Sequence, residues 1–343
     1  MLYLKDYLKE LNELNELKEL NELKELKELN ELSDLKIDKQ EYIIYPSNGC
    51  IYNTGSGGIT VCFYMVQLLK NKGIRARICC EKIVENPISN DYYIKGDAYN
   101  KDTIVIYGES VEGNPLNAKY IVRWILGPYY NSTTISTWNP TDIVYFFNYD
   151  EKHKFSGKHI HVDSLYKTLT IIYMNPIFKN ENKIRSINHA HLFHKTLFYH
   201  KKITHIHPEY SIEMPNMLPH NELFYFFNLC ETFISYDPIT FSTFIAALCG
   251  CVSVVYPIEN ITEKEWIEMT CLKQYSIDRK INKLNGIAYG YENIEHAKST
   301  LHLVQEQWND IIHYLTETSI DPFLKEMQTN KENTLNIVTN IYY

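Results

Sequence analysis

The chain has 343 residues, 45% of them hydrophobic, and a formal net charge of −8. This length predicts two domains of ordinary size, each with enough apolar residues for its own core. The acidic balance argues against a nucleic-acid partner, and the absence of any run of 18 uncharged apolar residues argues against a membrane span. Eight cysteines without a C-x-x-C pair predict reduced, buried thiols in a cytosolic-type compartment.

Residues 1–38 form a leader of low complexity. Leucine recurs every three residues from Leu8 to Leu32. An α-helix has 3.6 residues per turn, so these leucines spiral around it and leave no fixed apolar seam. We expect a frayed helix or a disordered arm, and the functional alternative is an arm for partner binding or self-association.

The next segment reads as a strand, a glycine-rich loop, a helix and a strand, over residues 41–46, 47–58, 59–69 and 74–80. Glycines before a helix let a ligand approach the backbone closely, so Gly57 and Gly58 are candidate ligand contacts. A dinucleotide fingerprint would need a further glycine where Thr60 stands. A nicotinamide-binding protein is therefore the weaker alternative.

Two acids follow the strand predicted over residues 103–107. Glu109 and Glu112 lie at its carboxyl end, where catalytic carboxylates are found in α/β folds, although both could equally be solvated loop acids. We expect a helix over residues 116–126 and a strand over 142–147. Arg123 would lie in that helix and either cap carbonyls, pair with an acid or contact a ligand.

The second half of the chain opens with a strand predicted over residues 168–173. Histidines then crowd together, and the spacing of His205 and His207 is that of one face of a strand. No cysteine or acid cluster completes a ligand set, so no metal site is predicted. The other histidines of this region are His189, His191, His194 and His200.

A β-α-β unit over residues 232–256 organises this half. A strand at 232–236 runs into Asp237, the expected N-cap of a helix over 239–249, with Pro238 as its first residue. Free N–H groups at a helix start bind anions, so Thr240 and Ser242 are candidate contacts of a phosphate-bearing ligand. The alternative is an ordinary capped core helix. Further on, Thr262 and Glu265 predict a capping box, and apolar residues from Leu301 to Leu315 stripe a long helix.

Taken together, the motifs resemble those of glycosyltransferases of the GT-B fold, in particular a group predicted in bacteria and giant DNA viruses. The resemblance covers most of the chain after residue 40 and rests on the order and spacing of several short segments. These segments are Gly55-Ser56-Gly57-Gly58, residues 113–119, Val122-Arg123-Trp124, Ser235-Tyr236-Asp237, residues 246–251 and residues 286–290. Many retaining members carry two glutamates eight positions apart, where this chain has Asp237 and Ile245. The retaining mode is therefore not carried over.

The resemblance implies an α/β protein of two Rossmann-like domains that face each other across a cleft. An acceptor domain would span residues 39–167, a sugar-nucleotide domain residues 168–305, and helices over 306–343 would pack back on the first domain. It further implies donor binding by Lys195, Tyr236, Asp237, Thr240 and Ser242, with Gly57 and Gly58 beside the donor phosphate and Glu109 or Glu112 as the base.

The implied activity is a metal-independent hexosyl- or deoxyhexosyltransferase, with a nucleotide sugar as donor substrate, no cofactor and a glycan or glycoprotein as acceptor. No D-x-D motif, the usual metal-diphosphate device, occurs in the sequence. The expected location is the cytoplasm, or the host cytoplasm or virion if the protein is viral. The alternatives are a non-catalytic sugar-nucleotide or glycan-binding protein and an NAD-dependent oxidoreductase. The sugar, the base, the acceptor, the stereochemistry and the oligomeric state stay open.

Overall fold

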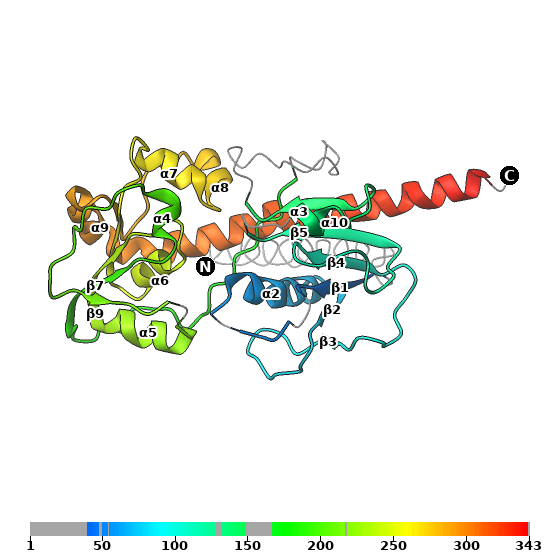
Figure 1. The fold of residues 1–343 in the computed structure, drawn as a ribbon, viewed down its shortest axis with the longest axis horizontal. Helices are drawn as coiled ribbons and strands as arrows, with labels where there is room; N and C mark the ends of the chain where they lie inside the picture. The colour runs from blue at the N-terminus through cyan, green and yellow to red at the C-terminus, as the bar shows by residue number, and fades with distance from the viewer. Residues whose placement is uncertain are drawn as a thin grey trace, which may run out of the picture.

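The computed structural model describes residues 40–341 except 48–49, 54, 128–131, 149–166 and 217. Figure 1 shows two α/β domains side by side, with one long helix, α10 (Val304–Ile341), running along both. The leader of residues 1–38 lies outside the described residues, and so does the prediction made for it.

The first domain contains a parallel sheet of six strands in the order β3-β2-β1-β4-β5-β6. This is the strand order of the dinucleotide-binding Rossmann fold. All five residues of β1 are buried, because a parallel sheet is covered on both faces. The strands are β1 (Glu41–Tyr45), β2 (Arg75–Cys79), β3 (Tyr92–Tyr93), β4 (Ile104–Gly108), β5 (Tyr120–Ile125) and β6 (Ile143–Phe146).

Helix α2 (Gly57–Asn71) covers one face of this sheet together with the later part of α10. The opposite face packs against side chains of the connecting loops, among them Val111 and Leu116. A short helix, α3 (Ser132–Ile135), lies between β5 and β6. The helix predicted over residues 59–69 is thus present and extends further at both ends.

The second domain contains a parallel sheet of five strands in the order β11-β10-β9-β7-β8. Counted from its own first strand, this is the order 2-1-3-4-5 of flavodoxin-like folds. The capping box predicted at Thr262 and Glu265 is confirmed at the start of α7. The strands are β7 (Ile187–Leu192), β8 (Ile212–Glu213), β9 (Cys230–Ser235), β10 (Val252–Val255) and β11 (Ile287–Tyr289). The helices are α4 (Thr196–Tyr199), α5 (His220–Leu229), α6 (Ser242–Leu248), α7 (Glu263–Met269), α8 (Lys273–Asp278) and α9 (Ile294–Thr300), with two 3-10 turns, η3 (Tyr291–Asn293) and η4 (Leu301–Leu303).

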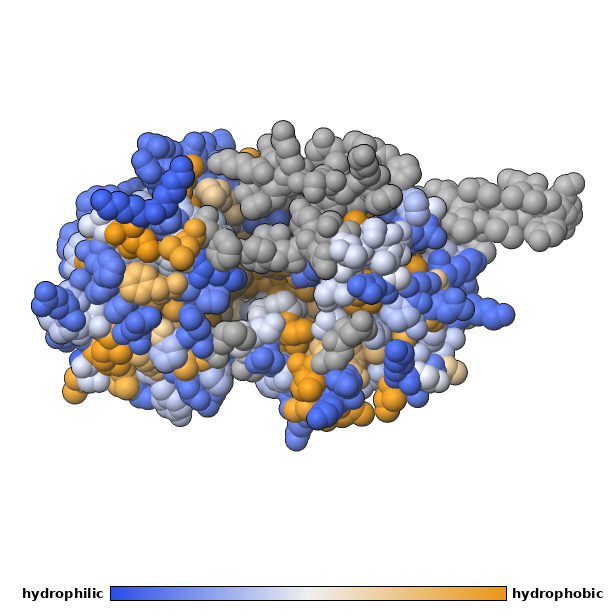
Figure 2. All heavy atoms as spheres, viewed as in Figure 1, coloured by the Kyte–Doolittle hydropathy of each residue, from blue (hydrophilic) through white to orange (hydrophobic). Residues whose placement is uncertain are grey.

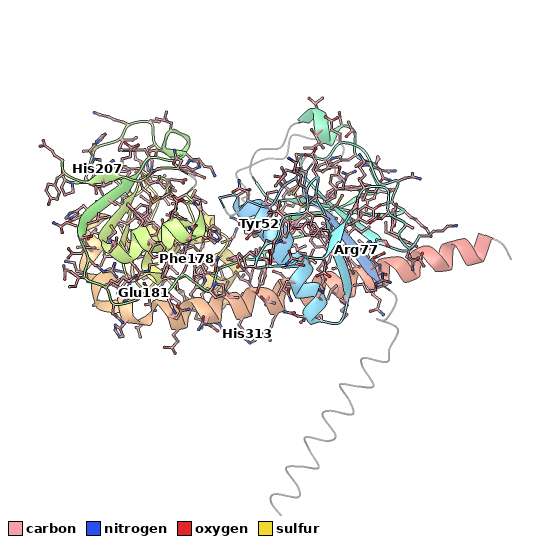
Figure 3. The ribbon with its side chains drawn as sticks, turned by 90° about the horizontal axis from the view of Figure 1, so that it is seen from below. Tyr52, Arg77, Phe178, Glu181, His207 and His313 are labelled. Atoms are coloured by element: carbon pink, nitrogen blue, oxygen red, sulfur yellow. The ribbon has the colours of Figure 1, made fainter. Side chains whose placement is uncertain are left out.

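Helix α10 packs into both cores, as Figure 3 shows from below. Trp308 and Ile311 belong to the core of the second domain, whereas Phe323 belongs to that of the first. Near its middle, Glu326 accepts a hydrogen bond from the hydroxyl of Tyr145 at 2.6 Å. One continuous helix therefore ties the two sheets together. The predicted architecture of two Rossmann-like domains facing each other is confirmed.

Two expected elements are wrong. Residues 116–126 hold strand β5 rather than a helix, because the β-branched and aromatic residues Val122 and Trp124 favour a strand and the segment fills a gap between β4 and β6. The preceding loop is closed by the side chain of Asn114, which accepts the N–H of Ala118 at 2.9 Å. Residues 168–173 do not open the second sheet; they form one bridge to β6, at Thr168, and pack on the first domain.

Arg123 is the buried cation of the first domain, 1% exposed. Its Nε donates to Asp142 at 2.7 Å, and its guanidinium also donates to the carbonyls of Val111 and Gly113. The guanidinium carbon lies 4.8 Å from the ring centre of Tyr107. Of the three roles left open by the sequence, Arg123 therefore fills two: it pairs with an acid and caps carbonyls.

Replacing Arg123 by methionine should lower the free energy of unfolding by about 3–5 kcal/mol, because the carboxylate of Asp142 stays buried without its partner. Urea denaturation measures this. Arg75→Met is the control. The Arg75 side chain is 76% exposed and forms a long ion pair of 3.9 Å with Glu41, so this variant should leave the midpoint unchanged. Equal midpoints for Arg123→Met and the wild type would contradict this role.

Candidate functional site

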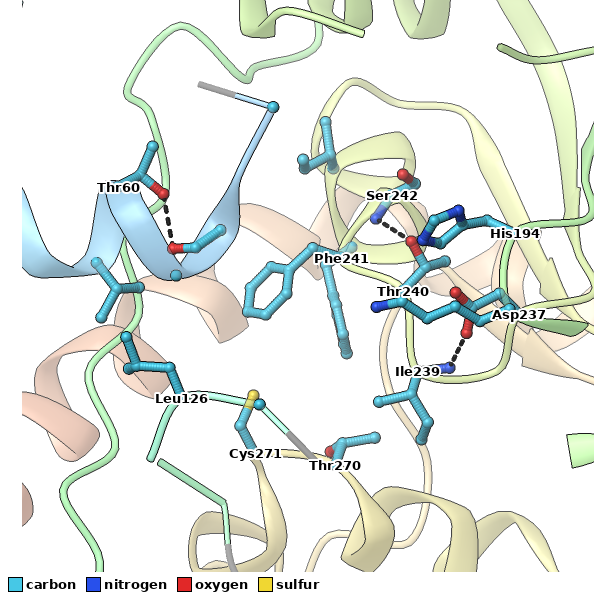
Figure 4. A pocket seen from close by; sticks show the side chains of 18 of the residues that line it. Thr60, Leu126, His194, Asp237, Ile239, Thr240, Phe241, Ser242, Thr270 and Cys271 are labelled. Atoms are coloured by element: carbon cyan, nitrogen blue, oxygen red, sulfur yellow. Dashed lines mark hydrogen bonds between the residues drawn. The ribbon is translucent and has the colours of Figure 1, made fainter. Parts of the chain in front are cut away.

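A cavity of about 450 Å³ lies between the two domains. The carboxyl ends of strands from both sheets point to it, which is where open α/β sheets bind ligands. The first domain contributes Gly55, Gly57 and Gly58 at the start of α2, and the second contributes the turns after β7 and β9. Figure 2 shows a hollow between the two lobes with hydrophobic surface inside, and Figure 4 shows the cavity from close by.

In the second sheet the order of strands reverses between β7 and β9. These strands pair in parallel, with Leu192 opposite Ser235, so the residues that follow them emerge side by side. The turn after β7 carries His194 and Lys195, and the turn after β9 begins at Tyr236 and Asp237. Lys195, His194 and Asp237 all line the cavity. A ligand placed at this reversal point would contact both turns.

Lys195 and Asp237 differ in burial. Lys195 is exposed and has a left-handed backbone with φ +51°, whereas Asp237 is only 1% exposed. Burial raises the pKa of Asp237, while its hydrogen bond to Ile239 and the positive charges of Lys195 and His194 act in the opposite direction. This part of the cavity thus holds one accessible cation beside one poorly solvated carboxylate.

The helix after β9 starts later than predicted. Helix α6 begins at Ser242 with Phe241 as its N-cap, so Asp237 does not cap it and Pro238 is not its first residue. Asp237 Oδ1 accepts the N–H of Ile239 at 3.1 Å, and Thr240 Oγ1 accepts that of Ser242 at 3.3 Å (Figure 4). Such local hydrogen bonds of Asp and Thr compete with helix formation. The first helical turn that was expected to bind an anion is therefore absent.

Thr240 and Ser242 nevertheless line the cavity, and so do Gly57 and Gly58 across from them. Phe241 projects between the two sides in Figure 4, with Thr60 of α2 opposite. The structure does not bring Tyr236 to the cavity. Its ring is fully buried and stacks on Phe193 at 4.5 Å, and its hydroxyl accepts the N–H of Ile206 at 2.7 Å.

The two candidate carboxylates are separated by the structure. Glu109, just after β4, accepts the N–H of Leu126 at 3.2 Å, and burial raises its pKa. Its Oε1 lies 3.6 Å from the position that a Cβ on Gly127 would occupy. Leu126 and Gly127 line the cavity, so Glu109 stands directly behind a wall residue without a side chain. Glu112 is exposed on the loop and does not line the cavity.

His191, His205 and His207 form a cluster of rings. Residues 205–207 are irregular, so the expected alternation is wrong, and His207 stacks on His191 with ring centres 3.8 Å apart. The Nδ1 of His207 lies 2.8 Å from the hydroxyl of Tyr236, which fixes this arrangement. Within the described part of the chain, no three metal-ligating side chains come together.

Several cavity residues escaped sequence reasoning, because no motif marks them. They follow β8 or lie in the segment between the domains, and only the fold places them at the carboxyl edge of the second sheet. These residues are Tyr173, Met174, Phe178, Met214, Leu218 and His220.

No helix among the described residues is both long and apolar enough to cross a membrane. No family model and no curated protein matches the sequence.

Several solved structures share the general fold. A mutant of T4 phage BGT in complex with UDP-glucose has 10% sequence identity and a TM-score of 0.45, over 85% of this chain and 99% of that one. An alpha-glucosyltransferase in complex with UDP and a DNA 13-mer has 11% identity and a TM-score of 0.40, over 80% and 99%. The wall teichoic acid polymerase TagF has 11% identity and a TM-score of 0.34, over 88% and 90%. Each TM-score is below 0.5, so none of these likenesses carries a conclusion about activity.

Asp237→Asn should stabilise the protein at pH 7. The pKa of Asp237 is raised in the folded state, so ionisation costs folding free energy once the pH rises from the unfolded value of 3.8 through the folded one. Asparagine keeps the Oδ1 acceptor for Ile239 without the charge. The melting temperature of the variant should exceed that of the wild type at pH 7, and the difference should shrink toward pH 3.

Asp310→Asn is the matched control, because Asp310 pairs with Arg279 at the surface, at 3.0 Å. It should give no gain at either pH. A gain for Asp237→Asn that is the same at pH 3 and pH 7 would contradict the assigned role of charge burial.

Proposed function

We propose that this chain is a glycosyltransferase that moves a sugar from a nucleotide-sugar donor to a hydroxyl group of an acceptor. The observation that carries the proposal is the cavity itself. It lies at the carboxyl ends of two parallel sheets, with one accessible cation, Lys195, on the second-domain side and a half-buried carboxylate, Glu109, behind the first-domain side. The resemblance of the sequence motifs to those of GT-B glycosyltransferases supports the same activity.

The second domain would hold the donor. Lys195 places a positive charge at the reversal point of the sheet, where it would stabilise the leaving diphosphate. The hydroxyls of Thr240 and Ser242 would donate hydrogen bonds to the same group. Asp237 is an anion, so it would accept hydrogen bonds from sugar or ribose hydroxyls. Gly57 and Gly58 offer backbone without side chains on the opposite wall, and nothing lies within 4 Å of a Cβ placed on Gly57.

The first domain would present the acceptor. Transfer requires a base that takes the proton of the acceptor hydroxyl. Glu109 suits this role, because burial raises its pKa and Gly127 leaves its Oε1 uncovered by a side chain. We propose a hexosyl- or deoxyhexosyltransferase with a glycan or glycoprotein acceptor, since a net charge of −8 does not favour a nucleic acid.

The alternative to a glycosyltransferase is a non-catalytic protein that binds sugar nucleotides or glycans. Release of free nucleotide from a nucleotide sugar, measured with and without an acceptor hydroxyl compound, separates the two. Binding without any release would favour the rival.

Lys195→Ala and Thr240→Ala should each weaken binding of a nucleoside diphosphate by about 1–3 kcal/mol, the scale of a lost hydrogen bond to a charged group. Titration calorimetry measures the affinity, and thermal unfolding should change little. Lys298→Ala is the control, because that lysine pairs with Glu295 on the surface of α9. Affinities equal to wild type for both cavity variants would place the donor elsewhere.

Glu109→Gln should lower kcat by about a hundredfold or more with little effect on donor affinity, because the amide cannot take a proton. In the wild type the acid limb of the pH profile should lie above the ordinary glutamate value of 4.5, in the direction of the burial-induced rise in pKa. Glu112→Gln, at the exposed acid three residues on, should behave as wild type. A kcat reduced by Glu112→Gln alone would reverse the assignment.

Activity should survive EDTA. The sequence has no D-x-D motif, and Lys195 supplies the positive charge that a metal supplies in metal-dependent enzymes of this class. Initial rates with and without chelator provide the measurement. Loss of activity that Mn²⁺ or Mg²⁺ restores would refute metal independence.

A further inference from the structure

The cavity has a second, apolar part on the β8 side of Lys195. This lobe contains no Asp, Glu, Lys or Arg among the described residues that line it. Burial of an uncharged ring is favourable in such surroundings, whereas a charged group would lose its hydration. In Figure 3, Phe178 of this lobe lies on the side of the second domain that faces the first. The walls of the lobe are Tyr173, Phe178, Met214, Leu218, His220 and Leu223.

His220 is a polar residue of the lobe, and the position of its ring proton is fixed by a chain of two hydrogen bonds. The N–H of Ile177 donates to Asn175 Oδ1 at 3.1 Å, which sets the orientation of that amide. The Nδ2 of Asn175 then lies 3.3 Å from His220 Nδ1. An amide NH₂ group only donates, so Nδ1 must accept and the ring proton must sit on Nε2.

The charge state of His220 follows from its surroundings. Burial lowers the pKa of His220, so its imidazole is neutral at physiological pH. Tyr173 stacks on the ring at a centroid distance of 6.4 Å, and Phe178 approaches it edge-on at 5.1 Å. No described residue accepts a hydrogen bond from Nε2. The lobe therefore contains a preset, neutral N–H donor without a protein partner.

The occupant must fit both parts of one continuous cavity. A nucleotide-sugar donor carries an uncharged planar base joined through ribose to a diphosphate, which matches an apolar lobe beside a cation. A fixed N–H donor pairs with a carbonyl oxygen and not with an exocyclic amino group. A base with the wrong group would also cover the N–H without pairing with it, which is how polar sites reject analogues.

We propose that His220, oriented by Asn175, selects the nucleobase of the donor. Its Nε2–H donates to the exocyclic carbonyl that distinguishes uracil from cytosine and guanine or hypoxanthine from adenine. This inference rests on the proposed function and adds the class of donor: an oxo base rather than an amino base.

Two pairs of ligands of nearly equal size test the proposal: UDP against CDP, and IDP against ADP. One of the two pairs should bind, and within that pair titration calorimetry should show that the oxo member binds at least tenfold tighter than the amino member. This is the scale of one hydrogen bond. His220→Phe keeps an aromatic ring against Tyr173 but has no N–H. The variant should lose this preference by weakening the oxo ligand while the amino ligand is unchanged.

Asn175→Asp tests whether Asn175 orients the His220 ring. A merely structural role of Asn175 would not make the base preference depend on pH. The carboxylate can only accept a hydrogen bond, so it would favour the tautomer protonated on His220 Nδ1; the neutral ring would then present Nε2 as an acceptor, and the pKa of the ring would rise. At high pH the variant should prefer the amino member of each pair. At low pH the doubly protonated ring should restore the oxo preference, whereas the wild type should keep one preference across this range.

The outcomes separate the two proposals. If no nucleoside diphosphate binds the wild type, the proposed function fails and this inference fails with it. If they bind without an oxo preference, or if His220→Phe retains the preference, only the inference is overturned. Thermal unfolding of both variants shows that they are folded.

Discussion

The parallel pairing of β7 with β9 is the interaction on which the site depends. It joins two strands that are separated in the chain by β8 and α5, and it sets Leu192 opposite Ser235. Every residue that follows these strands is placed by that register. A slip of one residue would turn the side chains of the shifted strand to the opposite face of the sheet. Lys195 and Asp237 both line the cavity because the pairing of β7 with β9 places the turns after these strands side by side.

Side-chain hydrogen bonds of two arginines hold the elements that surround the site. Arg185 donates to the carbonyls of Phe227 at 2.9 Å and Cys249 at 3.0 Å, near the ends of α5 and α6, and so ties together two helices on one face of the sheet. In the first domain Arg123 donates to the carbonyl of Val111 and so holds the loop before β5. Helix α10 then packs on both cores. Each domain therefore presents its loops from a fixed frame, which is the condition for a site assembled from two halves.

Sequence patterns predicted the strands and helices whose own residues decide their conformation. The β-branched runs of β9 and β10 and the capping box of α7 are such local signals. These patterns failed where the conformation depends on neighbouring strands or on side-chain hydrogen bonds that hydrophobic periodicity does not show. Residues 120–125 form a strand that fills the position between β4 and β6. Pro238 and Thr240 lie outside α6, because local side-chain hydrogen bonds hold the turn. His220 could not be found, because its role depends on Asn175, which lies 45 positions away.

The distribution of charge in the cavity sets the physics of binding. Among the described lining residues, Lys195 is the one lysine or arginine and Asp237 the one carboxylate. A diphosphate would thus be held by a single cation together with neutral hydroxyl and N–H donors. A single exposed cation is screened by salt, whereas hydrogen bonds and apolar contacts in an enclosed cavity are not. Under the proposed function, the apolar lobe and His220 would therefore provide most of the affinity for a donor at physiological ionic strength. If the chain transfers a sugar as proposed, the base would govern which donor is bound, and Lys195 would act mainly on the charge that develops as the sugar leaves.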